Sequence, residues 1–158
     1  MNKALTAALR KIIIFPVTLL TMSISINTAL AQKNNLNNLN NLYSPIPLPS
    51  STELSDTLSD KDIPTGQGGF ARDYTVKLNK GDNLAIDLSS ENFDGMITLL
   101  APDGSTVGEN DDGPDGTSNS LLFSRITETG NYIIRVRSFG ETGVGEFKLK
   151  VTKLQPVK

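Results

Sequence analysis

Acidic side chains crowd into one short polar stretch, ENDDGPDGTSNS, at residues 109–120. Its candidate metal ligands are Glu109, Asn110, Asp111, Asp112 and Asp115. Calcium takes six to eight oxygen ligands from carboxylates, amides and carbonyls, so this set has suitable chemistry for Ca²⁺. The stretch is not an EF-hand, because counting from Asp111 puts Gly113 at the third position and Leu122 at the twelfth. A solvated turn is the alternative, since Gly, Pro, Asn and Asp are common turn residues.

The residue types that most catalytic sites need are missing. The chain has no His and no Cys, which excludes His general bases, Cys nucleophiles, His or Cys zinc sites and the Ser-His-Asp triad. Two carboxylates can hydrolyse a glycoside, and the candidates are Asp94, Asp103, Glu109 and Asp111. Each lies beside a Gly, Pro or Asn that explains it as part of a turn. With no Trp and few other aromatic residues to build a sugar subsite, we predict no enzymatic activity.

The charge is distributed unevenly along the chain. The formal net charge is −2, but residues 1–31 contain Lys3, Arg10 and Lys11 and no acidic residue. The remaining residues therefore carry a net charge of −5. Because contacts to phosphate need a basic surface, we predict that the protein does not bind nucleic acid.

Residues 1–31 have the organisation of a secretory signal peptide. A basic start, MNKALTAALRK, precedes an apolar stretch at 12–26 and the small-residue sequence ALA at 29–31. The apolar stretch is interrupted by Pro16 and is shorter than the roughly 20 residues that a membrane span needs. We expect cleavage before Gln32, a secreted or periplasmic protein, and no membrane span after cleavage.

Residues 32–68 have the composition of a disordered linker. QKNNLNNLNNL repeats every three residues, and YSPIPLPSS has proline at alternate positions. A short helical turn around Leu54 and Leu58 is the alternative for the acidic end of this segment. Few apolar residues are available for burial, so the sequence predicts a spacer.

From Phe70 onward the apolar residues alternate, as they do in strands with one buried face. YTVKL and LAIDL, separated by NKGD, predict a hairpin, while MITLLA and SLLFSRI read as strands buried on more than one side. The predicted inward residues are Tyr74, Val76, Leu78, Leu84, Ile86, Leu88, Tyr132, Ile134, Val136, Phe147, Leu149 and Val151. Short strands about ten residues apart, with no amphipathic helix, predict an all-β antiparallel sandwich.

Residues 69–154 resemble the bacterial pre-peptidase C-terminal domain family, which is related to the collagen-binding modules of secreted collagenases. The stretches that carry the resemblance are ARDYTVKLNKGD, IDLSSENFDGMITLLAPDG, GENDDG and TGNYIIRVRSFGETGVGEFKLKV. The family implies a jelly-roll-like β-sandwich, followed here by a tail at 155–158.

The resemblance implies a non-catalytic accessory module. No peptidase precedes the domain in this chain, so we expect a free-standing module whose partner is an extracellular or periplasmic protein or glycan. The alternative is a calcium-dependent adhesion module that binds extracellular-matrix protein or glycan.

The resemblance also implies a second possible calcium site. In the collagen-binding relatives the ligands come from the segment before the first strand and from an Asp-Tyr pair, which matches Asp73 and Tyr74 here. Asp60 and Asp62 would then join Asp73 as ligands.

The resemblance also bears on partner binding, since collagen-binding relatives use exposed aromatic residues. The alternation instead directs Tyr74 and Tyr132 into the core, so we do not expect collagen binding. Phe139 is the aromatic residue that we predict in a surface loop, either as an anchor for a partner or as a plug at the end of the sandwich.

Overall fold

The computed structural model describes residues 43–66, 68–114, 116–140 and 142–155. The predicted signal peptide, residues 32–42 of the predicted linker and Asp115 lie outside the described residues. The strands all belong to one compact unit, Pro45–Lys158, and the fold described below is the fold of that unit.

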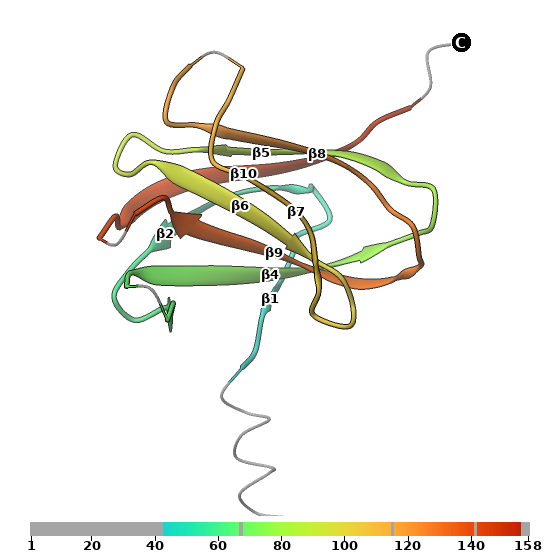
Figure 1. Ribbon diagram of the computed structural model, residues 1–158, viewed down its shortest axis with the longest axis horizontal. Helices are drawn as coiled ribbons and strands as arrows, with labels where there is room; N and C mark the ends of the chain where they lie inside the picture. Colours follow the sequence, from blue (N-terminus) through green and yellow to red (C-terminus); the bar gives the residue numbers. More distant parts are fainter. Residues whose placement is uncertain (1–42, 67, 115, 141, 156–158) are drawn as a thin grey trace, which may run out of the picture. The chain divides into compact units, whose positions relative to one another are not determined.

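Two β-sheets form this unit (Figure 1). Sheet A has the strand order β1 (Ile46–Pro47), β4 (Phe70–Leu78), β9 (Gly130–Ser138), β6 (Gly95–Leu100) and β7 (Thr106–Asn110), and β3 (Ile63–Pro64) also pairs with β4. Sheet B has the order β2 (Glu53–Leu58), β10 (Gly145–Lys153), β5 (Asn83–Ser89) and β8 (Ser120–Arg125). The parallel pairing of β1 with β4 is the exception among otherwise antiparallel pairings of the described strands. The predicted all-β sandwich is confirmed.

The core lies between the two sheets and contains nearly all of the predicted inward residues. Those that are buried are Tyr74, Leu78, Leu84, Ile86, Leu88, Tyr132, Ile134, Val136, Phe147, Leu149 and Val151, and Val76 is partly buried. Tyr74 from sheet A meets Phe147 from sheet B edge to face, with ring centroids 6.3 Å apart. Alternation therefore identified the buried face of these strands, because side chains at every second position point to the same side of a sheet.

The predicted hairpin of YTVKL and LAIDL is wrong. β4 pairs with β9 in sheet A, whereas β5 pairs with β10 and β8 in sheet B. The turn between them is present, since the N–H of Asp82 donates to the carbonyl of Asn79 at 3.0 Å, but it carries the chain from one sheet to the other. Turn residues and alternation are local properties, and neither determines which strand becomes the partner.

The two apolar runs differ in burial. In β6, which lies between β9 and β7 in sheet A, Met96, Ile97, Thr98 and Leu99 are all buried, as predicted. The prediction is wrong for β8, the edge strand of sheet B, where Phe123 is 63% exposed. Its three adjacent apolar residues give no alternation from which the exposed face could be identified.

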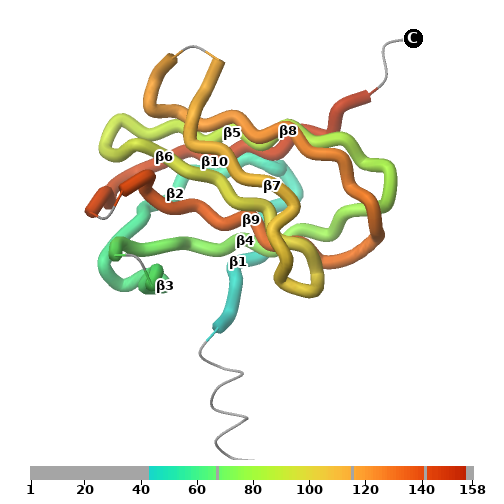
Figure 2. Tube along the Cα trace, in the orientation of Figure 1, coloured from blue at the N-terminus to red at the C-terminus, as the bar shows by residue number. Residues whose placement is uncertain are grey.

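The predicted linker is also wrong over residues 53–58, which form β2. Six residues of β2 pair with β10, and Leu58 is only 1% exposed. Figure 2 shows β2 among the strands of the folded unit. The sequence signal for a strand was weak because ELSDTL has only two apolar residues. The segment forms a strand through its pairing with β10.

Candidate functional site

Three connections meet at one end of the sandwich, which we call the loop end: residues 90–94 between β5 and β6, 111–119 between β7 and β8, and 139–144 between β9 and β10. Backbone hydrogen bonds join them, since Gly95 N–H donates to the Ser118 carbonyl at 3.0 Å and Phe139 N–H donates to the Asp94 carbonyl at 2.7 Å. The three connections contain no Lys or Arg in the sequence.

The structure places two of the predicted calcium ligands of the 109–115 stretch on a strand. Glu109 and Asn110 belong to β7 rather than to the loop, and consecutive strand residues point to opposite faces. The amide nitrogen of Asn110 donates to the carbonyls of Asp112, at 2.6 Å, and of Leu121, at 2.9 Å. Asn110 therefore fastens the acidic segment to β8.

Asp94, which the calcium prediction did not include, is close enough to Asp111 and Asp112 to be affected by their charge. Desolvation, followed by repulsion from these two carboxylates, raises the pKa of Asp94 above its ordinary value. Among the residues with described positions, no group of three or more His, Cys, Asp or Glu side chains is arranged to hold a metal ion. Calcium binding in this segment stays a prediction.

The alternative site at Asp73 is occupied by an ion pair. Both carboxylate oxygens of Asp73 accept hydrogen bonds from Arg135, from Nε at 2.8 Å and from the terminal nitrogen at 2.8 Å. Asp62, proposed as its companion ligand, instead accepts a hydrogen bond from Arg72 at 2.5 Å. These arginine contacts give both carboxylates a structural role.

Asp56 and Tyr74 form a polar cluster with Arg72 and Asp62, between β2 and β4. Arg72 Nε and the Tyr74 hydroxyl both donate to Asp56, at 2.9 and 2.8 Å. Burial opposes ionisation of Asp56, but the N–H of Thr57, the Tyr74 hydroxyl and Arg72 outweigh it and lower the pKa of Asp56. Burial, together with the neighbouring Asp56, raises the pKa of the Tyr74 phenol. The cluster fastens β2 to sheet A.

A polar groove of about 750 Å³ lies beside the loop end, over the outer face of sheet B. Its lining residues are Ser55, Asp56, Thr57, Ser89, Ser90, Glu91, Asn92, Thr117, Ser118, Asn119, Glu146, Phe147 and Lys148. Sequence reasoning missed this groove, because its residues come from three strands and two connections. The clustered polar residues TSNS at 117–120 were the one local signal.

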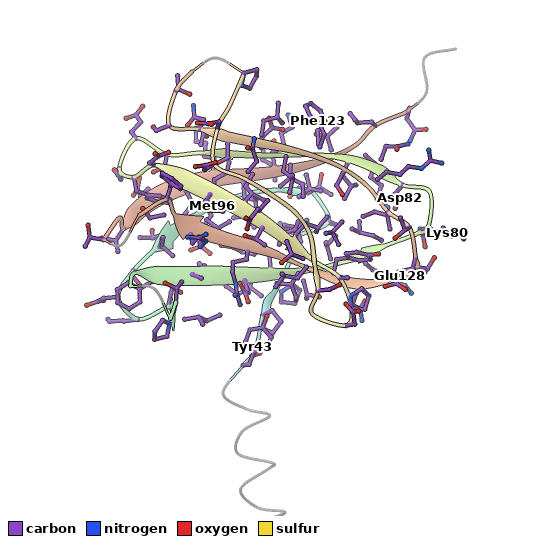
Figure 3. All side chains as sticks on the ribbon, viewed as in Figure 1. Tyr43, Lys80, Asp82, Met96, Phe123 and Glu128 are labelled. Atoms are coloured by element: carbon purple, nitrogen blue, oxygen red, sulfur yellow. The ribbon has the colours of Figure 1, made fainter. Side chains whose placement is uncertain are left out.

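Phe139 is 54% exposed at the loop end, in agreement with the predicted surface position. Val144, in the same connection, is 44% exposed. A second exposed aromatic residue, Phe123, lies on β8 and is labelled in Figure 3. The buried positions of Tyr74 and Tyr132 agree with their assignment to the core.

The two packed sheets and their connections define an all-β sandwich module. Residues 71–138 match the family described as Bacterial pre-peptidase C-terminal domain, which confirms the predicted resemblance.

The solved structures similar to this chain include two from bacteria. The first is the pre-peptidase C-terminal domain of collagenase from Bacillus anthracis, with 14% identity, a TM-score of 0.52, and coverage of 69% of this chain and 95% of that one. The second is PliG, a periplasmic inhibitor of g-type lysozyme from Aeromonas hydrophila, with 16% identity, a TM-score of 0.46, and coverage of 69% and 96%. The TM-score of 0.52 shows that this chain shares the fold of the collagenase domain. At 14% identity the likeness says nothing about what this chain binds.

A comparison with curated proteins found no match to this chain. Within the ranges that the structure describes, no helix is long and apolar enough to cross a membrane.

Proposed function

We propose that this protein is an exported, non-catalytic accessory module that binds another protein. The observation that carries the proposal is the family match across the centre of the sandwich, from β4 to β9. The polar clusters support it, because Asp56, Asp62 and Asp73 are engaged by arginines in the framework of the fold. The exposed Phe139 provides apolar surface of the kind that anchors protein partners.

Photo-crosslinking tests the binding proposal. Benzoylphenylalanine in place of Phe139, at the loop end, should cross-link the full chain to one periplasmic or secreted protein in a saturable manner. The same group in place of Lys80, at the other end of the sandwich, serves as the matched control and should give no such product (Figure 3). Equal products from both positions, or none from either, would refute the proposal.

Enzyme assays test the non-catalytic part of the proposal. The purified chain should not hydrolyse peptide or glycoside substrates at a rate above that of the buffer. A hydrolysis rate that Asp94→Asn or Asp111→Asn abolishes would show that carboxylate catalysis takes place.

Calcium-dependent adhesion to matrix protein or glycan is the second candidate function. The raised pKa of Asp94 favours it, because a bound cation would relieve the repulsion between Asp94 and the neighbouring carboxylates of Asp111 and Asp112. Adhesion to immobilised matrix protein that chelator removes and calcium restores would support this candidate, and adhesion that is indifferent to chelator would count against it.

A further inference from the structure

We infer that the polar groove over sheet B binds an extended, basic peptide segment of a partner protein. This inference rests on the proposed protein-binding function and names the surface and the chemistry of the partner.

The floor of the groove is built from side chains in register on three strands. Lys148 of β10 lies between Ser55 of β2 and Ser89 of β5, and Glu146 lies beside Thr57. These side chains point away from the core and are exposed. The volume of about 750 Å³ is within the range of roughly 300–1,000 Å³ that is typical of ligand sites.

The walls are held in place by hydrogen bonds within the protein. Ser90 Oγ donates to the Glu146 carbonyl at 2.7 Å and accepts from the N–H of Asn92 at 3.1 Å. The N–H of Ser90 donates to the side-chain oxygen of Asn119 at 3.2 Å, which joins the two walls. Asn92 also packs directly on Gly145, where an added Cβ would overlap its side chain. A groove that is already formed costs less entropy to occupy than one that must be assembled on binding.

The lining is suited to a peptide backbone. Hydroxyl groups donate and accept hydrogen bonds, and amide side chains do both, so Ser55, Ser89, Ser118 and Asn92 can pair with peptide N–H and C=O groups in turn. The aromatic lining residue, Phe147, is only 2% exposed and offers no open ring face to a sugar. This composition favours a peptide over a glycan.

The charge selects a basic segment. Glu91 and Glu146 line the groove against the single cation Lys148, while the charge of Asp56 is paired with Arg72. The three connections at the loop end add further acidic residues and no Lys or Arg. A negative surface steers positively charged partners toward it and disfavours negatively charged ones.

Nuclear magnetic resonance of the isotopically labelled full chain tests this inference with four probes: nine-residue synthetic peptides that alternate Ser with Arg, Gln or Glu, and spermidine. We expect the Ser-Arg peptide to shift the backbone amide signals of the groove, namely Ser55, Ser89–Asn92, Thr117–Asn119 and Lys148. Binding should weaken as salt rises, because the charges involved are exposed. The Ser-Glu peptide should leave these signals unchanged.

Charge-neutral variants test the groove itself. Glu91→Gln combined with Glu146→Gln should weaken binding of the Ser-Arg peptide by roughly three- to tenfold, as expected for the loss of two exposed ion pairs. Glu128→Gln, an equally exposed carboxylate at the opposite end, is the matched control and should leave binding unchanged (Figure 3). Ser55→Arg, which adds bulk and positive charge on the exposed floor, should block the groove.

The outcomes separate this inference from the proposed function. Peptide shifts on another surface, or binding unaffected by the groove variants, would overturn the groove and leave the protein-binding proposal standing. Spermidine binding as tightly as the Ser-Arg peptide would overturn recognition of a peptide. Failure of every peptide to bind, while the crosslinked partner of Phe139 is still captured, would also overturn this inference alone.

Discussion

Leu58→Ala tests whether β2 is part of the folded domain or part of a linker. Leu58 is 1% exposed within the core, and the strand that carries it pairs with β10 over six residues. Truncating a buried leucine to alanine removes about 2–5 kcal/mol from the free energy of unfolding. Because each kcal/mol moves the melting midpoint of a domain of this size by roughly 4–8 °C, we expect the midpoint to fall by roughly 8–40 °C.

The control for this prediction is the neighbouring residue on the same strand. Thr57 is exposed on the outer face of sheet B, so Thr57→Ala should change the free energy of unfolding by no more than about 0.5 kcal/mol. Thermal unfolding of both variants, followed by circular dichroism, gives the comparison directly. If Leu58→Ala melts within a degree of the unmodified chain, as a linker residue would, β2 does not contribute to the fold.

Four further predictions concern pH, calcium and export. Because the pKa of Asp56 is lowered in the folded state, its contribution to stability is present above its unfolded pKa and is lost as pH falls through the folded one. Asp56→Asn should therefore destabilise the protein at neutral pH and less so in acid, as chemical denaturation across pH measures, and an equal loss at all pH values would contradict this. The pKa of Asp94 is raised in the folded state, so its ionised carboxylate destabilises the fold at neutral pH. Asp94→Asn should therefore stabilise the protein at neutral pH and lose that advantage in acid. A loss of stability at neutral pH would contradict this. Calcium bound in the acidic segment would raise the melting midpoint more than magnesium does, and Asp111→Asn with Asp112→Asn would abolish that rise, whereas a shift below one degree would indicate a solvated turn. Mass analysis of the exported protein should find Gln32 at its N-terminus, and retention of Met1 would show that no signal peptide is cleaved.

The candidate site could be predicted only in part from the sequence. The acidic composition near residues 109–115 and the surface position of Phe139 were readable, because polar turn residues and chain connections lie at the ends of strands. The hydrogen bonds of Asn110 and the ion pair of Asp73 with Arg135 were not, since they depend on residues from different strands. Asp73 and Arg135 are 62 positions apart in the chain and meet only because β4 pairs with β9.

Local patterns in the sequence determined the buried face of most strands and the class of fold. The alternation through Tyr132, Ile134 and Val136 is enough to identify the buried face of β9, because side chains at every second position of a strand point to the same face. Tertiary structure alone decided which strands pair, so that β4 and β5 separate into different sheets and the weakly apolar β2 becomes an edge strand. It also created the polar groove, whose residues come from β2, β5, β10 and two connections. Strand pairing depends on all the strands that are available as partners, so the sequence of one segment is not enough to predict it.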